Sequence, residues 1–302
     1  MTKIVLSIFI IAATYYSTPT FALDKNLADA LALGASRGLS LEVKSREVIS
    51  SSASSIVFEL QLYNKLTGDI KLYERVPVLR TKGRLPTTFV LSGLQTGRDA
   101  IFLVPEIEDM RVVTYEYPFG ESTDPQAMLS QAGQKILLMN AQIVAAYLWL
   151  TQQADVDPAG LYSLNISFGS FVAPYALRIL AEMGISPSRT VFAFGGSDLA
   201  PFFHPLLKRD LKIDVDPEKV MNLTEKLSVA VSPTQHLKHL KGPFLIIRGL
   251  KDNTIPELSS MSLYNNLPEP KMLIELNTEH INTDKPDVIL ETMTSVVNWL
   301  SQ

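Results

Sequence analysis

Cysteine is absent from this sequence of 302 residues. Its absence excludes disulfide bonds, thiolate metal sites and a cysteine nucleophile together, and it is compatible with an oxidising compartment. The fold must therefore be held together by its hydrophobic core. The length and the 46% content of hydrophobic residues suffice for a sizeable core, in one large domain or one domain with an insertion.

Basic charge and long hydrophobic runs are also scarce. The formal net charge is −4, and no basic cluster is dense enough to bind phosphates, so a nucleic-acid partner is not expected. The apolar run at residues 4–13 has about half of the ~20 residues needed to span a bilayer. No other window is long and apolar enough. We therefore expect no stable membrane insertion once the N-terminal segment is removed.

The N-terminal segment has the pattern of a secretory signal peptide. Lys3 precedes the apolar run, and the small-residue ending Thr20-Phe21-Ala22 follows it. The pattern predicts cleavage after Ala22, so that residues 1–22 are the signal and residues 23–302 the mature, exported protein, either periplasmic or secreted. The alternatives are an uncleaved anchor and a buried N-terminal strand.

Short apolar runs recur along the rest of the chain and alternate with stretches of helical pattern. Runs without polar alternation are typical of strands that are covered on both faces, and strand–helix alternation predicts a doubly wound α/β fold with a mostly parallel sheet. The apolar runs are TTFVLSG, RVVTYEYPFG, GLYSLNIS, TVFAFGGSD, GPFLIIRGLKD and KMLIELNTEH; the helical stretches begin at Asp124-Pro125, Phe168 and Lys285-Pro286.

Two segments depart from this alternation. The runs SSIVFELQLYNKL and DIKLYERVPVLR, joined at Thr67-Gly68-Asp69, predict an antiparallel hairpin at one edge of the sheet. Residues 199–232 contain no buried-strand pattern, and we interpret them as a small helical cap insertion over one end of the sheet.

Ser167 lies where one apolar run ends and a helical stretch begins, in LYSLNISFGSFVAP. Ligands of parallel α/β sheets bind at the carboxyl ends of the strands, and a sharp strand-to-helix turn there exposes a serine hydroxyl in front of a helix N-terminus. Such a turn strains the backbone and needs small neighbours, which Gly169 satisfies and Asn165 satisfies less well. The alternative is that Ser167 is only a helix N-cap.

A serine nucleophile needs a base, and the chain has only four histidines. His280 directly follows the last apolar run, so a loop would bring it to the same edge of the sheet. His204 lies in the predicted insertion, and His236 and His239 precede a strand, which places them at the opposite edge. Strand direction therefore favours His280 as the base.

The base in turn needs an acid that orients it, and an oxyanion needs hydrogen-bond donors. Asp252 ends the apolar run before the last and is the predicted acid; Asp198, after another strand run, is the rival. The backbone N–H groups of Leu94, in the loop SGLQTG, and of Phe168, directly after the serine, are the predicted oxyanion donors.

The residues around Ser167, Asp252 and His280 make the sequence resemble the α/β-hydrolase-fold serine hydrolases. NISFG, RGLKDNTIP and TEHIN follow the order serine, acid, histidine, and SGLQTG resembles the early oxyanion loop. The chain is most similar to the esterase and dienelactone-hydrolase-like branches. That resemblance implies hydrolysis of a small-molecule carboxylic ester through an acyl-enzyme, with catalytic Ser167, Asp252 and His280 and with no cofactor or metal.

The sequence departs from the family pattern at three places and leaves other functions open. Asn165 and Ser170 stand where the family usually has glycine, and the oxyanion loop begins Ser92-Gly93 rather than His-Gly. A serine peptidase or an acyltransferase of the same fold would use the same residues, although an oligopeptide substrate would be expected to need an extra gating module and the sequence shows no propeller-sized extra domain. A non-catalytic binding protein with an α/β-hydrolase-like fold is the alternative from a different class.

Overall fold

The structure is a computed structural model, and several expected features lie outside the residues that it describes. These are the predicted signal at residues 1–22, the predicted cap insertion at 199–232 with His204, and the predicted oxyanion donor Leu94. The described residues are 41–81, 83–93, 96–118, 125–198 and 233–302, with the backbone alone for 125–137.

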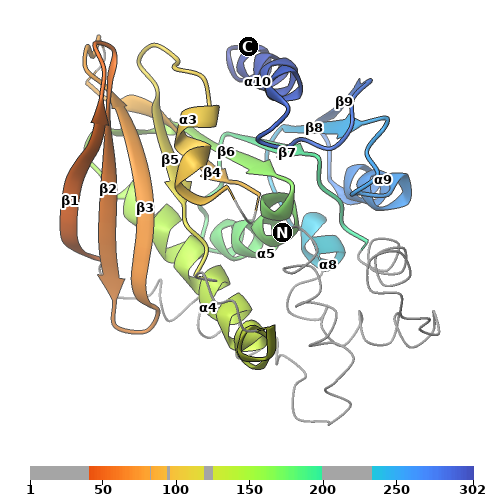
Figure 1. Cartoon of the computed structure of the whole chain (residues 1–302), viewed down its shortest axis with the longest axis horizontal. Helices are drawn as coiled ribbons and strands as arrows, with labels where there is room; N and C mark the ends of the chain where they lie inside the picture. Colours follow the sequence, from red (N-terminus) through yellow and green to blue (C-terminus); the bar gives the residue numbers. More distant parts are fainter. Residues whose placement is uncertain (1–40, 82, 94–95, 119–124, 199–232) are drawn as a thin grey trace.

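A single mixed sheet organises this part of the chain, with strand order β1-β2-β3-β5-β4-β6-β7-β8-β9 (Figure 1). The strands from β5 to β9 in that order are parallel, whereas β1, β2 and β3 are antiparallel to their neighbours. The bounds are β1 Glu42–Ser51, β2 Ser55–Asn64, β3 Gly68–Pro77, β4 Leu85–Leu91, β5 Arg111–Tyr115, β6 Val156–Ile166, β7 Arg189–Ala193, β8 Phe244–Gly249 and β9 Lys271–Leu276.

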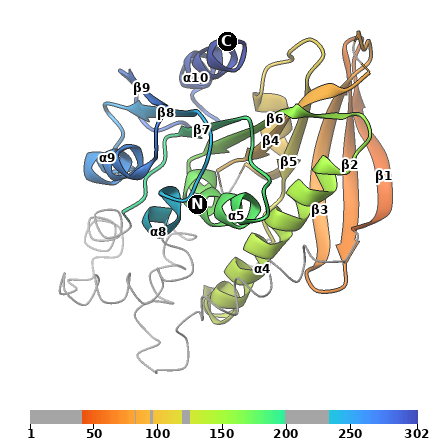
Figure 2. The same ribbon diagram turned by 180° about the vertical axis from the view of Figure 1, so that it is seen from behind.

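Helices cover both faces of this sheet, as Figures 1 and 2 show from opposite sides. One hydrophobic core joins the sheet to α4, α5, α8 and α9, and a second core joins the other face to α3 and α10. The fold class predicted from the alternating pattern is thereby confirmed. The bounds are η2 Gly97–Asp99, α3 Ala100–Leu103, α4 Pro125–Thr151, α5 Phe168–Glu182, α8 Pro233–Leu237, α9 Glu257–Asn266 and α10 Pro286–Leu300.

The predicted runs correspond to strands, because a run that is apolar on both faces can be buried only between two layers of helices. All five residues of β5 and all but one of β4 are buried. The last strand, β9, differs from the prediction: it forms the other edge of the sheet, and only its last residue, Leu276, is buried. The two earlier runs form the antiparallel hairpin β2–β3, as predicted, but β1 and not this hairpin occupies the edge of the sheet.

Strand β1 was not apparent in the sequence. It pairs antiparallel with β2 at the sheet edge, and most of its residues, including Val43 and Val48, are exposed. An edge strand without a buried face needs no alternation of apolar residues, so backbone pairing holds it while its sequence shows no strand pattern. Within the described residues, no helix has the length and apolarity that a membrane span requires.

Candidate active site

The backbone of Ser167 is strained. The residue joins β6 to α5 with φ 51° and ψ −113°, a region that a side-chain-bearing residue rarely adopts. Two backbone hydrogen bonds hold this turn: the N–H of Ser167 donates to the Ala193 carbonyl at 2.8 Å, and the N–H of Ser170 donates to the Ser167 carbonyl at 3.0 Å. The end of β7 and the first turn of α5 therefore maintain the sharp strand-to-helix turn that the sequence predicted.

Gly169 allows the start of α5 to lie directly against the end of β4. Its N–H donates to the Ser92 carbonyl at 3.1 Å, and a Cβ at this position would lie 1.9 Å from the carbonyl oxygen of Leu91. No side chain fits at that distance from a backbone atom. The glycine predicted from the turn is thus required by the contact between α5 and β4.

We expect Gly169→Ala to lower the free energy of unfolding by about 3 kcal/mol, because the added methyl group must push α5 away from β4. Gly83→Ala is the matched control, since nothing lies within 4 Å of its Cβ position. Urea unfolding followed by circular dichroism measures both. Equal stability of the two variants would contradict the contact that the geometry requires.

Asn165 stands where the proteins that the sequence resembles usually have glycine, and its polar atoms are not left unsatisfied. Its side chain is fully buried, and Nδ2 donates to the Val191 carbonyl of β7 and to Ser163 Oγ, each at 3.0 Å. Ser163 Oγ in turn accepts a hydrogen bond from the Tyr147 hydroxyl of α4 at 2.6 Å. The larger residue therefore fits because a polar network between β6, β7 and α4 surrounds it.

The structure brings Ser167, His280 and Asp252 together in one hydrogen-bonded chain. Ser167 Oγ lies 2.9 Å from His280 Nε2, and His280 Nδ1 lies 2.7 Å from Asp252 Oδ2. The side chains of His280 and Asp252 are 16% and 4% exposed, so both hydrogen bonds are largely shielded from water. These residues follow β6, β9 and β8, and they meet at the carboxyl edge of the sheet.

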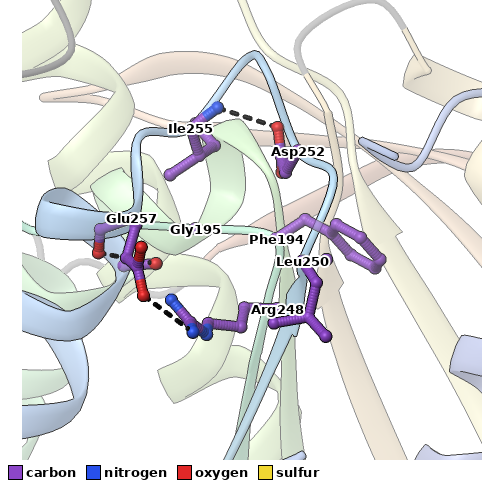
Figure 3. Close-up of a pocket in the computed structure, with 9 residues that line it drawn as sticks. Phe194, Gly195, Arg248, Leu250, Asp252, Ile255 and Glu257 are labelled. Atoms are coloured by element: carbon purple, nitrogen blue, oxygen red, sulfur yellow. Dashed lines mark hydrogen bonds and ion pairs between the residues drawn. The ribbon is translucent and has the colours of Figure 1, made fainter. Parts of the chain in front are cut away.

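The hydrogen-bond partners fix the imidazole tautomer. An ionised carboxylate only accepts hydrogen bonds, so His280 Nδ1–H donates to Asp252 Oδ2, which leaves Nε2 to accept from the Ser167 hydroxyl. The other carboxylate oxygen, Oδ1, accepts from the backbone N–H groups of Thr254 at 2.7 Å and Ile255 at 2.9 Å, the second of which is drawn in Figure 3. The carboxylate is therefore held in one orientation by its own loop.

Phe194 is a site neighbour that the sequence analysis missed. It directly follows β7 with φ 51°, and its buried ring stands edge-on to the His280 imidazole, with centroids 5.8 Å apart and planes at 84°. Its N–H donates to the Ile247 carbonyl of β8 at 2.8 Å. In the sequence, only its position at the carboxyl end of a strand could have indicated a place in the site. Of the residues after that strand, the sequence analysis considered Asp198 and not Phe194.

Two backbone segments converge beside the serine. Phe168 is the first residue of α5, and Gly93 lies two residues after the end of β4, where a Cβ would be 4.0 Å from the Cβ of Ser167. The predicted donor Leu94 follows Gly93 but lies outside the described residues, and the oxyanion role of both N–H groups stays a prediction.

The rival candidates lie elsewhere. His236 is buried in α8, where its ring packs edge-on against Tyr175 of α5, with centroids 5.1 Å apart. His239 follows α8, and both histidines precede β8, as the sequence indicated. Asp198 is exposed, and its backbone carbonyl accepts from Ser259 Oγ at 2.6 Å. The carboxylate on His280 Nδ1 is that of Asp252.

A small cavity lies beside Asp252, between the loop that carries this residue and the end of β7 (Figure 3). Phe194, Leu250 and Arg248 line it, and Arg248 is paired with Glu257. Its volume of about 70 Å³ is well below the roughly 300–1,000 Å³ of small-molecule sites. Among the described residues, no group of three or more histidine, cysteine or acidic side chains could hold a metal ion.

Comparison with known proteins gives matches only among solved structures: no family model and no curated protein matches the sequence. An acetyl xylan esterase from Paenibacillus sp. R4 is 15% identical, with a TM-score of 0.64, over 94% of this chain and 98% of that one. Carboxyl esterase 2 from Tuber melanosporum is 17% identical, with a TM-score of 0.58, over 94% and 98%. A prolyl endopeptidase structure is 15% identical, with a TM-score of 0.58, over 84% of this chain and 39% of that one.

These likenesses establish the fold. The two esterases match nearly the whole chain in both directions, so this protein has the α/β-hydrolase fold that the sequence resemblance implied. The identities of 15% and 17% carry no assignment of activity, because one fold hosts many functions and function depends on the site.

Proposed function

We propose that this protein is a serine hydrolase that cleaves carboxylic esters through an acyl-enzyme intermediate. The observation that carries the proposal is the hydrogen-bonded chain from Ser167 through His280 to Asp252. These three side chains supply the donors and acceptors that nucleophilic catalysis needs. Ser167 provides the hydroxyl, His280 provides a base whose Nε2 can accept the proton, and Asp252 accepts the hydrogen bond that holds the base in that tautomer.

The proposed reaction uses each of these groups in turn. Ser167 Oγ attacks the ester carbonyl carbon while His280 Nε2 takes the hydroxyl proton, and the carbonyl oxygen becomes an oxyanion beside the start of α5. The intermediate collapses with loss of the alcohol, which receives the proton from His280. Water then attacks the acyl group of Ser167 with His280 again as the base, and release of the carboxylic acid restores the free serine. Asp252 stabilises the imidazolium in both steps.

The names of the similar structures support esters as the substrate class. Of the three structures compared above, the acetyl xylan esterase and the carboxyl esterase match over nearly their full length, whereas the prolyl endopeptidase is matched over a minority of its length. A peptidase or an acyltransferase would use the same three residues. Comparing hydrolysis of p-nitrophenyl acetate with that of a peptide p-nitroanilide separates esterase from peptidase, and product analysis with added alcohol detects acyl transfer.

We expect a fluorophosphonate probe to label Ser167 stoichiometrically, because the activated oxygen displaces fluoride from phosphorus while His280 removes the proton. Intact-protein mass spectrometry should show one adduct, and peptide mapping should place it on Ser167. Urea-unfolded protein is the control and should stay unmodified, since the hydrogen bonds that activate the serine are lost. A folded protein that stays unlabelled and inactive would instead support a non-catalytic binding protein.

A further inference from the structure

Tyr117 connects the loop after β5 to both backbone segments that converge beside Ser167. Its side chain is buried, and its hydroxyl donates to the Ser92 carbonyl at 2.8 Å. The same carbonyl accepts the N–H of Gly169 from α5 at 3.1 Å. The Ser92 carbonyl is therefore held from two directions, by the helix that follows Ser167 and by a tyrosine from the loop after β5.

The ring of Tyr117 also contacts the other segment. It stands edge-on to Phe168, with centroids 5.1 Å apart and planes at 81°, and edge-on to Tyr115, with centroids 5.4 Å apart. Phe168 is the residue directly after Ser167. Tyr117 thus contacts Ser92 through its hydroxyl and Phe168 through its ring.

We propose that Tyr117 is a positioning residue for the oxyanion side of the site, where its hydroxyl holds the Ser92–Gly93 segment against the start of α5. This inference rests on the proposed serine hydrolase function. Burial raises the pKa of Tyr117 above its ordinary value, so the hydroxyl stays protonated and remains a donor over the pH range of an assay.

A residue in this position affects the rate of reaction more than substrate binding. Negative charge develops on the carbonyl oxygen only on the way to the tetrahedral intermediate, so donors aimed at that oxygen stabilise the transition state and not the bound ester. Loss of the Tyr117 hydroxyl loosens the segment without deleting a donor. The effect should therefore be smaller than the roughly 10²–10³-fold loss that removal of an oxyanion donor causes.

We expect Tyr117→Phe to lower kcat for p-nitrophenyl acetate about 10-fold, with KM changed less than about twofold. The midpoint of the pH–rate profile should not move, because His280 and Asp252 are untouched. Tyr115→Phe is the matched control: its buried hydroxyl donates to Gln142 Oε1 of α4 at 2.6 Å and not to the Ser92 carbonyl. That variant should lose comparable stability and keep its kcat within about twofold.

Equal kcat values for the two variants would overturn the inference, because the Tyr117 hydroxyl would then be only structural. A wild-type protein that neither hydrolyses the ester nor reacts with the fluorophosphonate would overturn the proposed function, and the inference with it. If Tyr117→Phe does not fold, Phe168→Leu tests the ring contact, since it keeps the backbone N–H. It should also lower kcat at nearly constant KM, and an unchanged kcat would overturn the inference.

Discussion

Ser167→Ala is expected to lower kcat for p-nitrophenyl acetate by roughly 10⁴- to 10⁶-fold. The substitution removes only Oγ, which is the atom that attacks the carbonyl and the atom 2.9 Å from His280 Nε2. No other described hydroxyl bonds to this nitrogen, so no neighbouring group replaces it. Residual hydrolysis would come from substrate binding and backbone donors alone.

The same substitution should leave the fold intact. The turn at Ser167 is held by backbone hydrogen bonds to the Ala193 carbonyl and from the Ser170 N–H, and alanine retains both. The midpoint of thermal unfolding, measured by circular dichroism, should stay close to that of the wild type. Ser295→Ala, on α10 with its Oγ bonded to the Glu291 carbonyl, is a matched control that should retain full activity. Undiminished hydrolysis by Ser167→Ala would remove the serine from the mechanism.

Asp252→Asn is expected to lower kcat by about 10⁴-fold, through the tautomer of His280. The new amide oxygen can replace Oδ1 as the acceptor for the Thr254 and Ile255 N–H groups. The amide nitrogen then faces His280 Nδ1 as a donor, so Nδ1 must accept and the imidazole proton moves to Nε2. An imidazole in that form cannot take the proton of Ser167.

Asp252→Asn distinguishes an effect on the catalytic rate from an effect on the stability of the fold. Asparagine preserves the shape of the side chain and its bonds to the loop, so the unfolding midpoint should fall far less than the rate does. Asp198→Asn is the control for the rival acid, and it should keep kcat within about twofold because His280 Nδ1 bonds to Asp252. A large loss in Asp198→Asn with a small loss in Asp252→Asn would assign the acid to Asp198. Initial rates with p-nitrophenyl acetate at saturating concentration measure both.

Several features could be predicted from local sequence because they depend on burial. Strands β4 to β8 are apolar on both faces, and runs of that kind are visible without any knowledge of the neighbours. Chain direction then placed Ser167, Asp252 and His280 after strands and His236 before one. The same logic failed for β1, whose exposed edge position imposes no pattern on its residues.

Other features depend on contacts that no local pattern contains. The sequence left Asp252 and Asp198 both available as the acid, and it marked Asn165 as an obstacle in the turn. The fold placed the Asp252 carboxylate on His280 Nδ1 and surrounded Asn165 with partners from β6 and β7. The roles of Phe194 and Tyr117 lie in a ring contact and a hydroxyl hydrogen bond between segments far apart in the sequence, and no residue pattern indicates such contacts.

The sequence by itself determined that this chain forms a mostly parallel sheet between helices, with a serine, an aspartate and a histidine at the ends of separate strands. Only the tertiary structure decided that these side chains lie within hydrogen-bond distance. The hydrophobicity of each short run indicates whether that segment is buried, so burial can be predicted from local sequence. The contact between Ser167 and His280 joins residues 113 positions apart, and it depends on the order of β6, β7, β8 and β9 and on how the loop after β9 returns across that edge.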